Sequence, residues 1–186
     1  MPLVKTNFDG LMIFEPVVHE DSRGYFFESY NQGIFTREGL DIIFIQDNQA
    51  SSSFGVIRGL HFQKEPHAQT KLLRVLSGKI IDVAVDIRKN SPSYGKAYTI
   101  ELSAENKKQL LIPKGFAHGY SVISETAEVF YKCDAFYHKE SEGGISWNDP
   151  ALNIDWQVPA GSETVSEKDA NYSNLSECDN DFVFNG

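Results

Sequence analysis

One stretch of the chain, KLLRVLSGKIIDVAVDIRK at residues 71–89, constrains the fold more than any other. It holds two apolar runs separated by Ser77-Gly78, a pair that is typical of a turn. In the second run, apolar side chains occupy every second position from Ile81 to Ile87. A period of two is the pattern of a β-strand with one buried face. The stretch therefore predicts two strands connected by a turn, the second of them half-buried.

Short apolar runs bounded by turn residues recur along the whole chain, which favours an all-β sandwich or barrel. Evidence for helices is confined to residues 31–38, where Asn31 is a plausible cap. The length of 186 residues suits one domain, so we expect a single domain over residues 1–186. Further strands are predicted at residues 11–18, 25–30, 42–50, 54–62, 97–103, 108–113, 117–124 and 127–136.

Composition narrows the classes of function. The chain is 41% apolar and 12% aromatic, enough for a real core. Its net charge of -9 disfavours nucleic acid and anionic membranes as partners, although a local basic cluster can still bind a phosphorylated ligand. No apolar run approaches the ~18 residues of a membrane span, and the N-terminus lacks the apolar segment of a signal peptide. We therefore expect a cytoplasmic protein; a disulfide between Cys133 and Cys178 stays open.

The sequence RGLHFQ at residues 58–63 places His61 between apolar neighbours on a predicted strand. A lone histidine is more often a core residue, but Arg58 is close by and charged residues are rarely buried unpaired. His118, on another predicted strand, raises the alternative of a metal site. Many metal-binding barrels of the cupin type carry His-x-His, whereas here the third position is Gln63, and an amide is a poor ligand for a transition metal. The pattern therefore disfavours a metal.

Two further residues have a structural and a catalytic interpretation. Tyr131 shares a strand face with Val129 and Cys133, and is either a core aromatic or a proton donor. A phenol has a pKa of about 10, so it stays protonated at neutral pH and can donate to an enolate. Asp169 lies in SEKDANY at residues 166–172, which is either a solvated turn or the source of a carboxylate that fixes the tautomer of a histidine.

Two polar stretches, HEDSRGYFFES at residues 19–29 and QDNQAS at residues 46–51, are either ordinary strand ends or parts of a binding surface. Guanidinium and ammonium groups hold phosphate oxygens, and amides read the edge of a base. Together with Arg58 and Lys71, these stretches are typical of a site for a nucleoside diphosphate.

Several longer motifs follow one another along the chain: DSRGYFFESYN, FIQDNQASS, VIRGLHFQ, KLLRVLSGKIIDVAVDIRKNSP, LSAENKKQLLIPKGFAHGY and VFYKCDAFYHKESEGGISWNDP. With these motifs the chain, from about Phe14 to Asp169, resembles the dTDP-4-dehydrorhamnose 3,5-epimerase family. The resemblance implies a cupin-like jelly-roll β-barrel with a few short helices, usually a homodimer, that uses no metal or other cofactor.

The resemblance also implies roles for individual residues. His61 would be the general base, with Asp169 as its orienting partner, and Tyr131 the general acid on the opposite face of the sugar. Lys71 would lie near the ketone oxygen and stabilise the enolate. The substrate-binding residues that it implies are Arg23, Glu28, Gln46, Asn48, Arg58, His118, Glu142 and Lys168.

The implied reaction converts dTDP-4-dehydro-6-deoxy-D-glucose to dTDP-4-dehydro-L-rhamnose by inversion at C3 and C5. Protons on the carbons beside a ketone are acidic, so one base, one acid and a cation for the enolate oxygen suffice. Three alternatives stay open: a single-carbon epimerase of another deoxysugar pathway, a metal-dependent cupin enzyme, and a sugar-nucleotide-binding module without turnover.

One feature of the 58–63 stretch conflicts with a regular strand. Strict alternation places the side chains of Arg58 and His61 on opposite faces, whereas the resemblance requires both near the substrate. A β-bulge at Gly59 would reconcile the two, since bulges re-aim side chains near active sites. The sequence therefore predicts an irregularity at Gly59.

Overall fold

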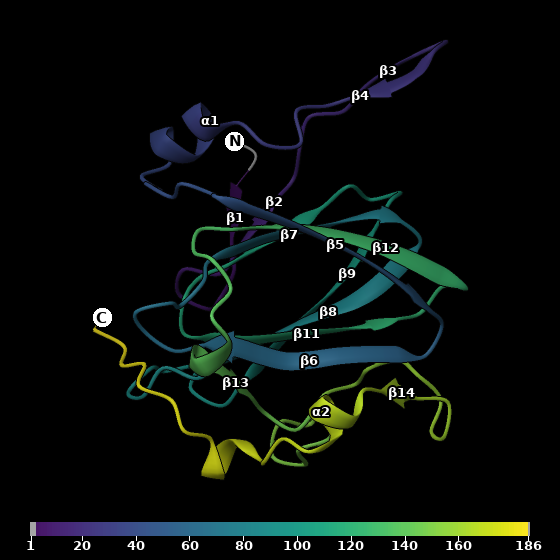
Figure 1. Ribbon diagram of the computed structural model, residues 1–186. Coiled ribbons are helices and arrows are strands. Elements are labelled where there is room, and N and C mark those ends of the chain that lie inside the picture. Colours follow the sequence, from purple (N-terminus) through teal and green to yellow (C-terminus); the bar gives the residue numbers. More distant parts are fainter. Residues whose placement is uncertain (1–2, 186) are drawn as a thin grey trace.

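The computed structural model describes residues 3–185 and shows two β-sheets that face each other across an apolar core (Figure 1). The first sheet has the order β1 (Leu3–Lys5), β2 (Met12–Phe14), β10 (Gln109–Ile112), β7 (Lys71–Ser77), β12 (Thr126–Cys133) and β5 (Gln46–Ser53). The second has the order β13 (Glu142–Gly144), β6 (Val56–Gln63), β11 (Phe116–Val122), β8 (Lys79–Asp86) and β9 (Ala97–Ser103), and β14 (Thr164–Val165) pairs with β6. This is the cupin-like jelly roll that the sequence predicts.

A two-stranded hairpin, β3 (His19–Asp21) and β4 (Gly24–Phe26), projects away from the two sheets (Figure 1). The helices are short: α1 (Gln32–Arg37) and α2 (Glu167–Ala170), with single 3₁₀ turns at Lys139–Ser141 and Leu175–Glu177. Asn31 caps α1, because its side-chain oxygen accepts a hydrogen bond from the backbone N–H of Gly33, as predicted. None of the helices within the described residues has the length and apolar character needed to cross a bilayer.

Strand positions agree with prediction where the apolar runs are long. The strand expected at 42–50 begins only at Gln46, because the segment before it packs outside the first sheet with Ile42 and Phe44 against Phe35 and Leu72. The strand expected at 25–30 is reduced to the three residues of β4. The strands β1, β3, β13 and β14 were not predicted, because two or three residues are too few to show alternation.

The prediction that the second strand of the 71–89 stretch is half-buried is wrong. In β8, every residue from Ile80 to Asp86 is buried, because both faces of the second sheet are covered. Ile80 and Ala84 point into the core between the sheets, whereas Ile81 and Val83 point outward. Asp82, on the polar side of the alternation, therefore faces the interior of the barrel rather than solvent.

The C-terminal third of the chain supplies this outer cover of the second sheet (Figure 1). Trp156, Leu175 and Phe182 pack against strands β6 and β8. The tail also adheres to the barrel, since Val183 forms a bridge with Lys89. The first sheet is covered on its outer face by α1, so polar side chains inside the barrel are shielded from solvent on both sides.

The predicted irregularity at Gly59 is confirmed. The register of β6 against β11 shifts, so that His118 pairs with His61 but Tyr120 pairs with Arg58. The side chains of Arg58 and His61 are therefore both on the inner face, while Ile57 and Leu60, also three positions apart, are both in the outer cluster. Gly59 has a φ of 122°, and a Cβ there would lie 2.5 Å from the Cα of Gly119.

We predict that Gly59→Ala destabilises the fold more than Gly24→Ala. Gly24 has a similar φ of 119° but nothing within 4 Å of a Cβ, so it isolates the cost of the backbone conformation, about 1–3 kcal/mol. Gly59→Ala adds a clash with a neighbouring strand, which costs roughly a further 1–3 kcal/mol. Urea unfolding of the two variants measures the difference. Equal losses would show that the close approach of β6 and β11 does not require glycine.

Candidate active site

The centre of the candidate site is a histidine held by a carboxylate. His61, on β6, places its Nε2 atom 2.7 Å from Oδ1 of Asp169, which lies in α2. The other carboxylate oxygen of Asp169 accepts a hydrogen bond of 3.0 Å from the backbone N–H of Gly59, at the bulge. The carboxylate is 5% exposed and the imidazole 30%, so the imidazole is partly accessible while its partner is buried. Two residues that are far apart in the sequence thus meet as predicted.

The protonation state of the pair follows from the surroundings of Asp169. Burial raises the pKa of this carboxyl, but hydrogen bonds from His61 and from Gly59 N–H outweigh burial and hold it below its usual value. An ionised carboxylate only accepts hydrogen bonds, so Nε2 of neutral His61 carries the proton. Nδ1 of His61 is then unprotonated and able to act as a base.

Tyr131 and Lys71 lie on the opposing sheet, on the adjacent strands β12 and β7. The Nζ atom of Lys71 is 5.9 Å from the centroid of the Tyr131 ring. Burial raises the pKa of Tyr131 to about 12, so the phenol keeps its proton. Burial also lowers the pKa of the Lys71 ammonium, against the opposing influence of Cys133, Asp82 and Glu142, and a more acidic ammonium is a stronger hydrogen-bond donor.

A second histidine–carboxylate pair lies beside His61. His118, directly across from His61 on β11, places Nε2 2.5 Å from Oδ1 of Asp82. Both side chains are buried, and Oδ2 of Asp82 has no hydrogen-bond partner within residues 3–185. Each of the two histidines is therefore tied to its own aspartate rather than to a shared centre.

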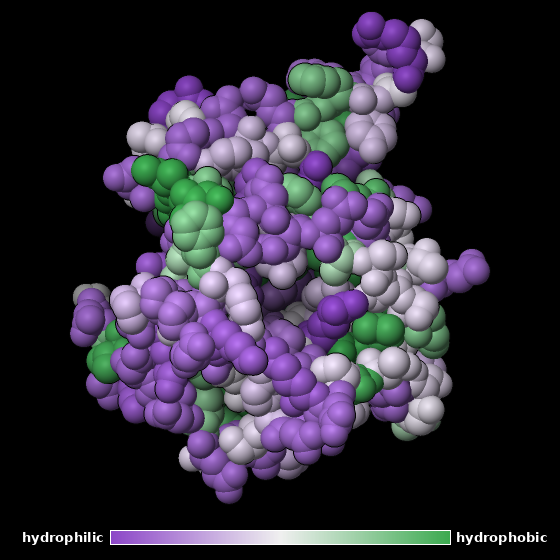
Figure 2. Space-filling model, in the orientation of Figure 1, coloured by the Kyte–Doolittle hydropathy of each residue, from purple (hydrophilic) through white to green (hydrophobic). Residues whose placement is uncertain are grey.

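The predicted amide and guanidinium ligands border the same interior. Gln46 donates to the side-chain oxygen of Asn48 at 3.0 Å, and Asn48 pairs with Tyr131 across β5 and β12. Arg58 donates from Nε to the Ser52 hydroxyl at 3.1 Å. At the other end of β6, Glu142 accepts hydrogen bonds from Lys168 and from the Tyr137 hydroxyl. A hollow bordered mostly by hydrophilic residues is visible on this face of the molecule (Figure 2).

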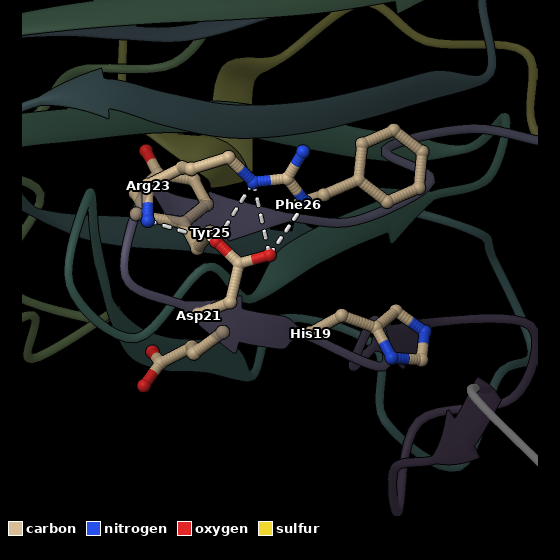
Figure 3. A pocket seen from close by; sticks show the side chains of 7 residues that line it. His19, Asp21, Arg23, Tyr25 and Phe26 are labelled. Carbon is tan, nitrogen blue, oxygen red and sulfur yellow. Dashed lines mark hydrogen bonds and ion pairs between the residues drawn. The ribbon is translucent and has the colours of Figure 1, made fainter.

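Two of the predicted binding residues are not brought to this interior. Arg23 lies on the projecting hairpin, where its guanidinium forms an ion pair with Asp21 and is 88% exposed (Figure 3). Glu28, just after the hairpin, accepts a hydrogen bond of 3.0 Å from the Asn31 side chain. Within one chain, the hairpin does not contribute these two residues to the cluster around His61.

Sequence reasoning missed three residues of the site. Asp82 carried a usable signal, because the alternation in β8 places it on the side opposite Ile81. Tyr137 and Tyr172 lie outside regular strands and have no periodic signal. The ring of Tyr172 packs against His61, which only the path of the chain after α2 reveals.

Gln63 stands where metal-binding cupins of the His-x-His pattern have a ligand. Here its side chain forms hydrogen bonds to the backbone instead. Its amide donates to the backbone oxygens of His67 and Phe136 and accepts from the N–H of His138. Among residues 3–185, no three His, Cys, Asp or Glu side chains gather in an arrangement that could hold a metal ion.

An oriented histidine facing a buried phenol and an ammonium inside a jelly-roll barrel is the apparatus of an acid–base enzyme of the cupin-like class. Comparison with known proteins gives the family. Residues 5–177 match the family model described as dTDP-4-dehydrorhamnose 3,5-epimerase, and the chain belongs to this family of enzymes.

Individual relatives agree with that assignment. The chain is 49% identical over 180 residues to the dTDP-4-dehydrorhamnose 3,5-epimerase of Shigella flexneri, covering 96% of this chain and 98% of the relative. The crystal structure of the same enzyme from Elizabethkingia anophelis is 53% identical, with a TM-score of 0.89, and the match covers 94% of this chain and 96% of that one. The Legionella pneumophila dTDP-6-deoxy-D-glucose-3,5-epimerase, solved with dTDP-4-keto-L-rhamnose, is 44% identical with a TM-score of 0.91, covering 95% and 94%.

We predict that Asp169→Asn lowers kcat about 10³- to 10⁴-fold, as expected when a histidine is left in the wrong tautomer. An amide would present N–H to Nε2 of His61, and the ring would then carry its proton on Nδ1. Asp179→Asn is the matched control, because that carboxylate is exposed and pairs only with Lys64. Comparable kcat values for the two variants, measured on folded protein, would contradict the orienting role.

A second prediction concerns the titration of Tyr131. Because its pKa is raised to about 12, its contribution to the free energy of unfolding is complete below the ordinary tyrosine pKa of about 10 and is lost as the pH rises toward 12. Phenolate absorbance of the wild-type protein and of Tyr131→Phe should therefore coincide at pH ~10 and diverge only above pH ~11. A difference of about half a phenolate at pH ~10, the value for a tyrosine of ordinary pKa, would show that the phenol is not buried.

Proposed function

We propose that the protein inverts C3 and C5 of dTDP-4-dehydro-6-deoxy-D-glucose to give dTDP-4-dehydro-L-rhamnose. The observation that carries the proposal is the carboxylate-bound His61 on one sheet with Tyr131 and Lys71 on the sheet that faces it. A base and an acid on opposite walls can act on opposite faces of a sugar ring bound between them. A protein that only binds a sugar nucleotide has no need of such a pair.

In the proposed mechanism, Nδ1 of His61 removes the proton from a carbon beside the C4 ketone. The electrons of the broken C–H bond form the double bond of an enolate, and negative charge develops on the C4 oxygen. Lys71, whose buried ammonium is a strengthened donor, hydrogen-bonds that oxygen. Asp169 stabilises the imidazolium that forms on His61.

Tyr131 then returns a proton to the other face of the same carbon. With its pKa raised to about 12, it is a weak acid toward water, but an enolate carbon is basic enough to take the proton. Burial raises the pKa of Tyr131, whereas the positive charge of Arg58 lowers it, because that charge stabilises the phenolate left after proton transfer. Solvent returns the proton to Tyr131 and removes the one on His61 before the second carbon reacts.

We further propose that the remaining predicted ligands bind the nucleotide: Gln46, Asn48, Arg58, His118, Glu142 and Lys168 from the barrel, with Arg23 and Glu28. The last two are supported as ligands only if the protein is a homodimer in which the hairpin of one subunit reaches the barrel of the other. The projection of the hairpin, with Tyr25 and Phe26 61% and 68% exposed, supports this arrangement.

We also propose that the chain forms one domain, located in the cytoplasm. The core between the sheets and the clusters on their outer faces draw on both ends of the chain, which supports one domain. Residues 1, 2 and 186 of the predicted domain lie outside the described residues.

A single-carbon epimerase is the second candidate. A 3'-monoepimerase from Streptomyces bikiniensis shares the fold at a TM-score of 0.85, but at 28% identity, whereas several relatives named 3,5-epimerase are 42% to 50% identical. Identity therefore favours the double epimerase. The metal-dependent alternative gains no support from the described residues.

Proton NMR in deuterated water tests the proposal. With dTDP-4-dehydro-6-deoxy-D-glucose we expect solvent deuterium at both C3 and C5. His61→Ala should abolish exchange at both carbons, because the base is lost. Tyr131→Phe should suppress inversion more than exchange, because deprotonation by His61 survives. Exchange at C3 alone would identify a single-carbon epimerase, and exchange at neither carbon by folded wild-type protein would refute the proposal.

The dimer arrangement predicts complementation between inactive variants. Arg23→Ala damages the site of the partner subunit, whereas His61→Ala damages the site of its own subunit. A statistical mixture of the two, refolded together, should recover about one quarter of the wild-type sites, since half of the dimers are mixed and each has one intact site. No recovery, despite mixed dimers shown by mass spectrometry, would mean that the hairpin serves its own barrel.

A further inference from the structure

Tyr172 lies directly after α2 and is fixed in place by the backbone that follows it. The carbonyl oxygen of Ser173 accepts a hydrogen bond of 2.9 Å from the N–H of Ser146. A little further on, the N–H of Leu175 donates to the buried carboxylate of Asp149 at 2.8 Å. These contacts attach the segment to the chain that continues from β13, so Tyr172 has a defined position beside the second sheet.

The ring of Tyr172 contacts the proposed base. Its centroid is 5.9 Å from that of the His61 imidazole, and the two planes meet at 68°, an edge-to-face arrangement. Gly144, which pairs with His61 across β13 and β6, makes room for the ring. A Cβ at Gly144 would lie within 2.5 Å of three ring carbons of Tyr172. The ring therefore occupies space that any other residue at position 144 would take.

The hydroxyl end of Tyr172 reaches the ion pair at the edge of the site. It lies beside the ammonium of Lys168, which is bound to Glu142. Burial raises the pKa of Tyr172, so the hydroxyl is neutral at physiological pH. One side chain thus spans from the proposed base to two of the proposed substrate-binding residues.

We propose that Tyr172 is a positioning residue that fixes the orientation of the His61 ring. The inference rests on the proposed function and extends it. The hydrogen bond to Asp169 fixes one edge of the imidazole, but a single hydrogen bond leaves the ring free to tilt about that contact. Tyr172 closes the side toward the C-terminal segment and limits the tilt of the ring, and with it the direction in which Nδ1 points. Proton abstraction is sensitive to such tilting, because small misplacements of a catalytic group cost large factors in rate.

Substitution of Tyr172 tests the role of the ring. Tyr172→Ala should lower kcat about 10- to 100-fold with KM changed far less. Tyr172→Phe, which keeps the ring, should recover kcat to within about threefold, with any remaining defect confined to KM through Lys168. Tyr98→Ala is the matched control, since Tyr98 is also half-buried and meets Phe8 edge-to-face at 5.6 Å and 73°, away from His61. Equal kcat values for Tyr172→Ala and Tyr98→Ala would overturn the proposal.

A double-mutant cycle with Gly144 tests the contact itself. Gly144→Ala should push the ring away from His61 and reproduce the loss of kcat although Tyr172 is present. In the Tyr172→Ala background the same change should have no further effect, because the methyl group then has free space. The Gly144→Ala single variant keeps the proposal testable even if Tyr172→Ala folds poorly, because it displaces the ring while Tyr172 is present. Independent, multiplicative losses from the two changes would overturn the proposal.

The tautomer of His61, read from ¹⁵N chemical shifts of the imidazole ring, separates this inference from the proposed function. In wild-type protein we expect one tautomer with the proton on Nε2, and in Tyr172→Ala a mixture or exchange-broadened signals. Active wild-type protein in which Tyr172→Ala changes neither kcat nor these signals would refute only the positioning role. Wild-type protein without deuterium exchange would refute the epimerase instead.

Discussion

The carboxylate of Asp169 is the contact on which the organisation of the site depends. One oxygen accepts from His61 and the other from the N–H of Gly59, so a single side chain fixes both the base and the bulge that aims it. The bulge in turn places Arg58 and His61 on the same face of β6. Without it, one of these two polar side chains would be directed into the apolar cluster on the outer face of the sheet, where an unpaired polar group is costly.

The interior of the barrel holds ionisable side chains, which are rarely buried without partners, and the construction of the fold explains how they are shielded. Asp82, Lys71 and Tyr131 are surrounded by apolar side chains of both sheets, and the outer faces are covered by α1 and by the C-terminal third of the chain. Exclusion of water lowers the pKa of Lys71 and raises the pKa of Tyr131, because burial disfavours the charged form of each group. The cover of the sheets therefore tunes the chemistry as well as stabilising the fold.

The sequence allowed the strands, the helix cap at Asn31 and the anomaly at Gly59 to be predicted, because each is a local pattern. The sequence did not allow the burial of both faces of β8 to be predicted. Alternation shows that a strand has two different faces, but it does not show which other segments pack against each face. Asp82, which was missed, holds His118 inside the barrel. The roles of Asp169 and Lys71 came from family resemblance, since nothing in their spacing shows that they approach His61 and Tyr131.

The position of Arg23 and Glu28 is likewise not explained by the fold of a single subunit. The hairpin is well formed within one chain and exposes Tyr25 and Phe26, yet it projects away from the two sheets (Figure 1). Large aromatic side chains that are exposed together on a projecting element are typical of a surface that contacts another molecule. An arginine held beyond its own barrel is suited to supply a further cation for a diphosphate to a second copy. Residues that look misplaced in one subunit are thus consistent with a site that two subunits share.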